Sequence, residues 1–267
     1  MDTIEKKIEG NVLFDLNDDT NTSNTNTNTS NTNTNTNDVN HDTNSIVYNN
    51  FNYIEERKNM LRAENVKRPP ACGLIVIDNF YNNALDTRNY VLTQEFSVKG
   101  NYPGQRTISY ANEHLRDIIQ KYVEPFGGKI IQFPMPKSDL SDAATIYNGS
   151  FQYTTSRDRS WVHVDSWNNW AGVLFLTPDA PLSAGTAFYR FHDGTTIEAD
   201  NKLLDNKKET DSYSQDLTKW DIVDRAGNVF NRLILFNSHR YHMSMDYFGD
   251  SKENGRLFQV FFFSTER

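Results

Sequence analysis

Cysteine is nearly absent from this sequence: Cys72 is the only one among 267 residues. An internal disulfide bond is therefore excluded, and such cysteine usage is typical of a reducing compartment. No apolar run approaches the roughly 20 residues that are needed to span a bilayer. Residues 1–9 also lack the apolar segment of a signal peptide. We therefore expect a protein of the cytoplasm or nucleus, with no membrane partner.

Positive charge is also in short supply. The chain has 27 lysines and arginines against 35 acidic residues, which gives a formal net charge of -8. Because an acidic surface repels phosphate groups, we do not expect a nucleic-acid partner. A phosphate-binding glycine loop, a CxxC pair and a Gly-x-Ser-x-Gly turn are absent as well.

The polar residues are concentrated near the N-terminus, where residues 18–45 contain long runs of alternating Asn and Thr. Such a stretch has no apolar face to bury, so it cannot offset the entropy that ordering would cost. The sequence predicts a low-complexity, largely disordered tail over residues 1–45. A folded domain then follows over residues 46–267, with its core at about 70–267.

Within that core the pattern changes from helical to extended. Helices are predicted over residues 82–96 and 115–123, and Pro125 is expected to end the second one. Short apolar stretches predict strands at 73–80, 129–133, 143–153, 171–176, 186–191, 232–236, 242–245 and 256–264. The polar segment 198–218 is expected to be an exposed insertion. This order indicates an α+β fold in which helices back a β-sandwich or jelly roll.

One pair of residues in this strand-rich part has metal-binding character. His163 and Asp165 are separated by one residue, and in an extended chain residues i and i+2 point to the same face. An imidazole and a carboxylate from one strand can therefore converge on a single ion. Taken alone the pair is weak evidence, because a His-x-Asp step also arises by chance as a surface pair.

The order of the residues that follow strengthens this interpretation. An apolar strand at 170–176 is followed by a Gly185-Thr186 turn, then by an apolar strand at 231–236. A loop with His239 and His242 comes next, and a final strand opens on Arg256. This ordered combination resembles the 2-oxoglutarate/Fe(II)-dependent oxygenase superfamily of prolyl-hydroxylase-like proteins, over about residues 70–267. The resemblance implies a double-stranded β-helix.

The resemblance also implies a set of site residues. His163, Asp165 and His242 are the ligands of Fe(II), which leaves three adjacent positions for 2-oxoglutarate and O2. In this superfamily 2-oxoglutarate is decarboxylated to succinate and CO2 while the substrate is hydroxylated. Arg256 is the expected anchor of the distal 2-oxoglutarate carboxylate. Tyr153 matches a position that often hydrogen-bonds the same carboxylate, although a core tyrosine is an equal alternative.

Several alternatives stay open at this point. His242 begins a strand-like stretch and is preferred as third ligand over His239, which lies in the preceding turn. Phe258 stands where many family members have Ser or Thr. Two other classes therefore stay open: an inactive jelly-roll binding or structural module, and a hydrolase that uses the same ligands for Zn(II). A protein or peptide substrate is favoured over a small molecule, and no role is assigned to Arg106.

Overall fold

The structure is a computed structural model that describes residues 72–137, 143–165, 167–191 and 213–267. The predicted tail and most of the predicted insertion lie outside these residues. The boundary between tail and domain therefore stays a prediction.

The larger of two antiparallel sheets has seven strands. Its order is β1-β8-β5-β10-β4-β2, and β3 pairs with the far end of β10. The strands are β1 (Leu74–Ile77), β2 (Gln105–Ser109), β3 (Ile130–Gln132), β4 (Ser150–Thr154), β5 (Trp170–Phe175), β8 (Leu233–Asn237) and β10 (Arg256–Thr265). Strand β10 is central, because it pairs with β5 on one side and with β4 and β3 on the other.

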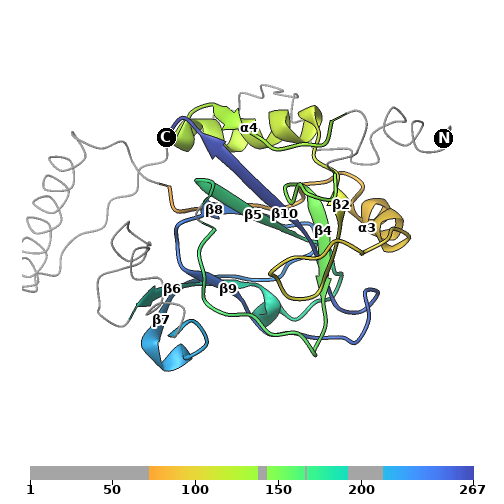
Figure 1. Cartoon of the computed structure of the whole chain (residues 1–267), viewed down its shortest axis with the longest axis vertical. Helices are drawn as coiled ribbons and strands as arrows, with labels where there is room; N and C mark the ends of the chain where they lie inside the picture. Colours follow the sequence, from red (N-terminus) through yellow and green to blue (C-terminus); the bar gives the residue numbers. More distant parts are fainter. Residues whose placement is uncertain (1–71, 138–142, 166, 192–212) are drawn as a thin grey trace, which may run out of the picture. The chain divides into compact units, whose positions relative to one another are not determined.

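The smaller sheet has three strands in the order β7-β6-β9. These strands are β6 (Thr186–Phe191), β7 (Trp220–Ala226) and β9 (His242–Ser244). The helices of the described residues are α3 (Ala84–Leu92) and α4 (Glu113–Gly127). Figure 1 shows α4 along one face of the larger sheet and the smaller sheet facing the other. The predicted α+β arrangement, with helices backing jelly-roll-like antiparallel sheets, is confirmed.

Strand β10 is buried on both of its faces. Its odd-numbered residues Leu257, Phe261 and Phe263 pack in a cluster with Leu115 and Ile119 of α4. The even-numbered face looks toward the smaller sheet, and Phe262 packs there in a second cluster that includes Phe175, Phe188 and Phe236. Because successive side chains alternate along a strand, the even-numbered residues of β10 line the interior between the two sheets.

Helix α4 differs from its prediction at the C-terminal end. Asn112 caps the first turn by accepting a hydrogen bond from the backbone N–H of Leu115, as a helix N-cap does. Pro125 was expected to end the helix, but the helix continues through it to Gly127. A proline in the last turn removes only one hydrogen bond of the ladder. The chain turns at Gly128, which has a φ of 76°.

Two strands were missed, and two were predicted too long: of the predicted stretch 73–80 only Leu74–Ile77 forms a strand. Strands β2 and β7 are rich in polar residues, and only part of each is buried. The alternation of apolar residues that predicts a strand is weak in such segments. The stretch 143–153 forms a strand only from Ser150 onward. Neither α3 nor α4, the helices of the described chain, has the length and apolar character to cross a membrane.

The predicted boundary leads to the first test. Deletion of residues 1–45 should change the melting temperature by less than about 2 °C, because a segment without an apolar face adds little to a core. Thermal unfolding followed by circular dichroism measures this directly. A larger drop would mean that the tail packs on the domain and that the boundary is misplaced.

Candidate metal centre

Two histidines lie directly opposite each other at the edge of the smaller sheet. The backbone N–H of His163 donates to the carbonyl of His242 at 3.0 Å, and the reverse bond measures 2.9 Å. This mutual pair is the hydrogen-bonded position of an antiparallel ladder, whose opposed side chains share a face. The two imidazole rings accordingly stand 4.3 Å apart, centre to centre.

Asp165 joins the pair from two residues farther along the same segment. Its backbone N–H donates to the carbonyl of Ser238 at 2.9 Å, which holds the segment extended. Its Oδ2 lies 3.3 Å from Nε2 of His242. One ligand atom from each of His163, Asp165 and His242 lies within 4.8 Å of the other two. The three residues named from the sequence are thus brought together in a group that can hold one ion.

Both imidazoles are oriented by backbone carbonyls. Nδ1 of His163 lies 2.9 Å from the carbonyl oxygen of Trp161, and Nδ1 of His242 lies 2.9 Å from that of Arg240. Because a carbonyl can only accept, each Nδ1 carries the proton in the neutral ring. The Nε2 atoms are then left with free lone pairs, which is the tautomer that an Nε2 metal ligand requires.

The charge states suit a cation as well. Burial, with the neighbouring His242, lowers the pKa of His163 to about 4, so this ring is neutral at physiological pH. For Asp165, burial acts to raise the pKa, but the contact with the His242 imidazole and the positive charge of Arg106 outweigh it. The pKa of Asp165 is lowered, and its carboxylate stays ionised.

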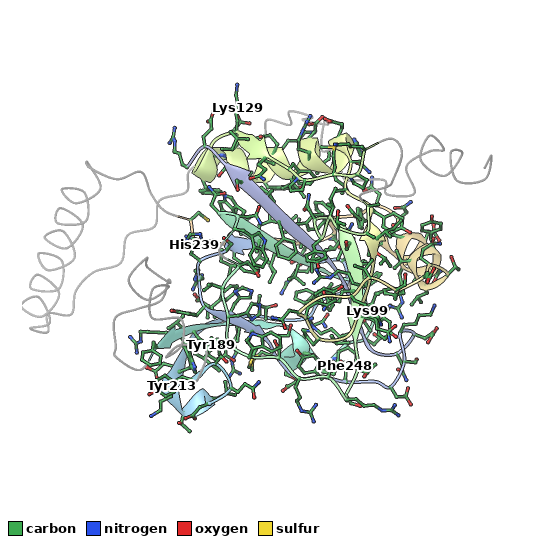
Figure 2. All side chains as sticks on the ribbon, in the orientation of Figure 1. Lys99, Lys129, Tyr189, Tyr213, His239 and Phe248 are labelled. Carbon is green, nitrogen blue, oxygen red and sulfur yellow. The ribbon has the colours of Figure 1, made fainter. Side chains whose placement is uncertain are left out.

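His239 is not part of this group. It lies on the loop that follows β8, where Figure 2 labels it. Its backbone N–H donates to the side-chain oxygen of Asn237. The positions of the described residues therefore favour His242 over His239 as third ligand.

Arg256 is the first residue of β10, and its side chain is completely buried on the interior face. Its Nε donates to the carbonyl of Ala184 at 3.0 Å, and its Nη2 contacts that of Gly185 at 3.4 Å. Its Nη1 is buried and has no hydrogen-bond partner among the described residues. Burial lowers the pKa of Arg256 to about 10, which leaves the guanidinium charged at neutral pH.

Other unpaired buried atoms gather around this guanidinium. Of the six such side-chain atoms in the described part of the chain, five belong to Thr154, Thr186, Asn228, Tyr247 and Arg256 itself. Thr154 is the cross-strand partner of Arg256, and Thr186 follows Gly185. Asn228 donates to the same Ala184 carbonyl as Arg256, and Tyr247 interacts electrostatically with Arg256. Since buried polar atoms are normally paired, this cluster marks a place where a polar ligand can bind.

The family model described as "Family of unknown function (DUF6445)" matches residues 62–263, which is most of the chain. The chain belongs to DUF6445. No curated protein matches it.

Among solved structures, this DUF6445 chain is similar to HygX from Streptomyces hygroscopicus with nickel and 2-oxoglutarate bound. The identity is 12%, the TM-score is 0.49, and 73% of this chain and 83% of that chain are covered. A prolyl hydroxylase from Trichoplax adhaerens, in complex with a hypoxia inducible factor peptide fragment, shows 11% identity and a TM-score of 0.40, covering 79% and 92%. A Pseudomonas putida prolyl-4-hydroxylase shows 10% identity and a TM-score of 0.33, covering 72% and 88%. These values are too low to bear on activity.

Tyr153 requires a correction. It pairs across the strands with Leu257, on the face of the sheet opposite to Arg256, and its ring packs 5.0 Å from that of Phe96. A shift of one residue along a strand reverses the direction of the side chain. Tyr153 is therefore the core tyrosine of the alternative interpretation, and it does not face the interior of this DUF6445 protein.

The tyrosine near Arg256 is Tyr247, whereas the sequence analysis had considered Tyr153 for that position. Burial raises the pKa of Tyr247, although Ser160 and the Arg256 charge act to lower it. Ser160 lies near this hydroxyl without completing a hydrogen bond. Sequence reasoning missed Tyr247 because it lies in the loop between β9 and β10, where no periodic pattern marks a buried side chain.

Phe258 also has an explanation in the structure. The guanidinium carbon of Arg256 lies 4.3 Å from the centre of the Phe258 ring and 5.4 Å from that of Phe175. A cation over an aromatic face is attracted to it. The phenylalanine therefore orients the arginine in the DUF6445 chain, where a Ser or Thr hydroxyl was expected.

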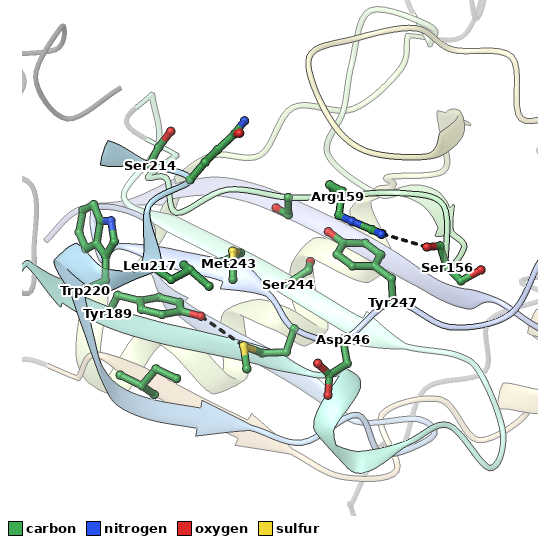
Figure 3. Close-up of a pocket in the computed structure, with 14 residues that line it drawn as sticks. Ser156, Arg159, Tyr189, Ser214, Leu217, Trp220, Met243, Ser244, Asp246 and Tyr247 are labelled. Atoms are coloured by element: carbon green, nitrogen blue, oxygen red, sulfur yellow. Dashed lines mark hydrogen bonds between the residues drawn. The ribbon is translucent and has the colours of Figure 1, made fainter. Parts of the chain in front are cut away.

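A cavity of about 510 Å³ lies on the other side of the smaller sheet. Figure 3 shows Tyr189, Trp220 and Met243 along it, with the Tyr189 hydroxyl 3.2 Å from the sulfur of Met245. Met243 and His242 are neighbours on β9, so their side chains point to opposite faces. Ser244 and Tyr247 line the cavity as well, so its edge reaches the Tyr247 hydroxyl near Arg256, whereas none of the three ligand residues lines it.

The geometry of the group leads to a metal-binding test. His163→Ala and Asp165→Ala should each abolish binding of one Fe(II) per chain, measured by anaerobic titration, because two donors hold an ion poorly. His242→Ala should do the same, whereas the matched variant His239→Ala should bind nearly as wild type does. The opposite ranking of the last two variants would move the third ligand to His239.

Proposed function

We propose that this chain is a 2-oxoglutarate- and Fe(II)-dependent oxygenase with a double-stranded β-helix core. The observation that carries the proposal is the convergence of His163, Asp165 and His242, with both Nε2 atoms free for a metal. Two imidazoles and one carboxylate form the facial set of non-heme Fe(II) oxygenases. The unpaired Nη1 of Arg256 supports a carboxylate-bearing cosubstrate.

The proposed reaction is a hydroxylation. One oxygen atom of O2 enters a C–H bond of the substrate as a hydroxyl group. The other oxygen enters 2-oxoglutarate, which loses CO2 and leaves as succinate. Fe(II) and 2-oxoglutarate, when bound, supply the activation of O2, which no side chain provides by itself.

The chain's own residues supply binding and orientation. The carbonyls of Trp161 and Arg240 hold the two imidazoles so that they cannot rotate away from the ion. Nη1 of Arg256 can donate to the distal carboxylate of 2-oxoglutarate, in a charge-assisted hydrogen bond. The hydroxyl of Tyr247 can donate to the same group.

Aromatic rings restrict the access of water to the proposed site. The ring of Phe236 lies 4.7 Å from that of His242, and the ring of Phe188 lies 6.4 Å from it. Both phenylalanines are fully buried. An apolar wall of this kind lowers the local dielectric constant and strengthens the interactions within the site.

The two alternatives account for fewer of these features. A Zn(II) hydrolase explains the three ligands but leaves Arg256 and the unpaired atoms around it without a task. Asp165, the acid in the ligand group, would also be unavailable as general base while it binds the metal. The argument for an inactive module was that Phe258 replaces a Ser or Thr. In the structure, however, the Phe258 ring packs against the guanidinium of Arg256.

The cosubstrate assignment is tested at Arg256. Arg256→Ala should keep Fe(II) but lose 2-oxoglutarate affinity by about 30-fold to several thousand-fold, the range expected when a buried charge pair loses one partner. Arg256→Lys should recover only part, because an ammonium lacks the geometry of the guanidinium. The measurement is the charge-transfer absorption of 2-oxoglutarate chelated to Fe(II) under anaerobic conditions.

Two results would contradict this scheme in different ways. If wild type never develops the absorption band at millimolar 2-oxoglutarate, the oxygenase proposal fails. If wild type and Arg256→Ala titrate alike, the chemistry can stand but Arg256 is not the anchor.

The correction at Tyr153 gives a matched pair of variants. Tyr247→Phe removes the hydroxyl beside Arg256 and should weaken 2-oxoglutarate binding about 3- to 10-fold, as expected for one neutral hydrogen bond. Tyr153→Phe removes a hydroxyl on the opposite face and should leave that affinity unchanged. A larger effect from Tyr153→Phe, in the same anaerobic titration, would reverse the assignment.

A further inference from the structure

A second buried guanidinium lies in the interior, on β2. Arg106 is only 5% exposed, and its cross-strand partner is Gln152. Gln152 is in turn the partner of Phe258, whose ring contacts Arg256 on the interior face. Because cross-strand partners share a face, Arg106 points into the same interior as Arg256.

The guanidinium of Arg106 is held rigidly by neutral groups. Its Nε and Nη2 both donate to Oε1 of Gln152, at 3.0 and 2.5 Å. The ring of Tyr102 lies 3.7 Å from its central carbon, and that of Tyr147 lies 5.0 Å away. Aromatic faces stabilise the cation but do not neutralise it. The third nitrogen, Nη1, has no hydrogen-bond partner among the described residues. It is also not one of the fully buried unpaired atoms, so it is accessible to solvent.

Two of the four buried arginines in the described residues have a nearby acidic group, and Arg106 is one of the two that do not. The buried arginines of the described residues are Arg88, Arg106, Arg240 and Arg256. Arg240 forms an ion pair with Asp224, and Arg88 interacts with the charge of Glu253. Arg106 has no acidic group within ion-pair distance among the described residues, and the same holds for Arg256. A buried charge without a partner is costly, so both positions favour an anion.

The acidic residue whose charge acts on the pKa of Arg106 is the proposed metal ligand Asp165. Each of the two groups shifts the pKa of the other, so they lie near each other. They form no ion pair, however, so Asp165 does not neutralise the guanidinium. A group bound at Nη1 of Arg106 would therefore lie near the proposed ligand set.

Binding of a metal cation would increase the excess of positive charge around the site. A divalent cation, two buried guanidinium groups and one carboxylate leave three positive charges around the site. The dianion 2-oxoglutarate, bound at Arg256, compensates for two of them. One positive charge remains, at Arg106, and burial has already made that charge unfavourable, since it lowers the pKa of Arg106 to about 10.

We propose that Arg106, positioned by Gln152 and Tyr102, binds a carboxylate group of the prime substrate and so selects acidic substrates. This inference rests on the proposed oxygenase function and adds the substrate class to it. The carboxylate belongs either to a small organic acid or to an acidic side chain of a peptide. In both cases it docks on Nη1, and a C–H bond of the same molecule lies next to the metal.

The first experiment needs no variant. The full chain is loaded with Fe(II) anaerobically and saturated with 2-oxoglutarate. Calorimetry then compares small mono- and dicarboxylic acids, peptides with Asp or Glu, and the carboxamide of each. At least one acid should bind about 30-fold or more tightly than its amide, since the amide lacks the charge that the guanidinium pairs with. Equal binding of every acid and its amide overturns the proposal, and the better class of acid identifies the source.

The second experiment assigns the effect to Arg106. Arg106→Met keeps the length and apolar stem of the side chain but removes the charge, and it should abolish the preference for acids over amides. Arg106→Lys should restore part of it. The 2-oxoglutarate absorption band should persist in both variants, because that cosubstrate depends on Arg256. Loss of the band in Arg106→Met, with folding unchanged by circular dichroism, would make Arg106 the cosubstrate anchor and overturn the proposal.

A third arm separates this inference from the proposed function. Binding of the same acids is measured to the Arg256→Ala chain without 2-oxoglutarate, so that Arg256 cannot contribute. Acid binding that disappears on adding Arg106→Met supports the carboxylate site even if wild type fails to form the 2-oxoglutarate band. Acid binding that survives Arg106→Met excludes the site, whether or not the band forms.

Discussion

The pair of backbone hydrogen bonds between His163 and His242 is the contact on which the proposed site depends. It sets the segment that contains His163 against the edge of β9, so that two residues 79 positions apart present their rings on one face. The alternation of the strand then brings Asp165 to the same face. The ligand geometry thus follows from the register of the sheet. A slip of one residue would turn the imidazoles toward the cavity on the far side.

The interior between the two sheets combines an apolar wall with unusual positive charge. Phe175, Phe188 and Phe236 exclude water, while Arg106 and Arg256 are buried without an acidic partner among the described residues. Such an arrangement costs stability in the free protein and is explained if anions bind there. The unpaired atoms around Arg256 support the same view, because a polar ligand would pair several of them together.

The proposed ligand set and the proposed anchor could be selected from the sequence, because the order of motifs along the chain resembles a known family. The His-x-Asp step lies in an extended segment, and Arg256 opens the longest strand. The residues around them were not predictable. Arg106 lies on a polar strand that the sequence does not predict, and Tyr247 lies in a loop without periodicity. The two roles left open for Tyr153 could not be separated, because spacing along the chain does not define which way a strand residue points until its partners are known.

The sequence by itself indicated both helices and most of the strands, because periodicity and residue type are local properties. The ordered motifs, through their resemblance to a known family, selected His163, Asp165 and His242 as proposed metal ligands and Arg256 as proposed anchor. Tertiary structure alone decided which faces meet, that Arg106 and Arg256 share one interior, and that neither has an acidic partner within the described residues. These depend on the pairing of strands that are distant in sequence, and no local pattern encodes that pairing.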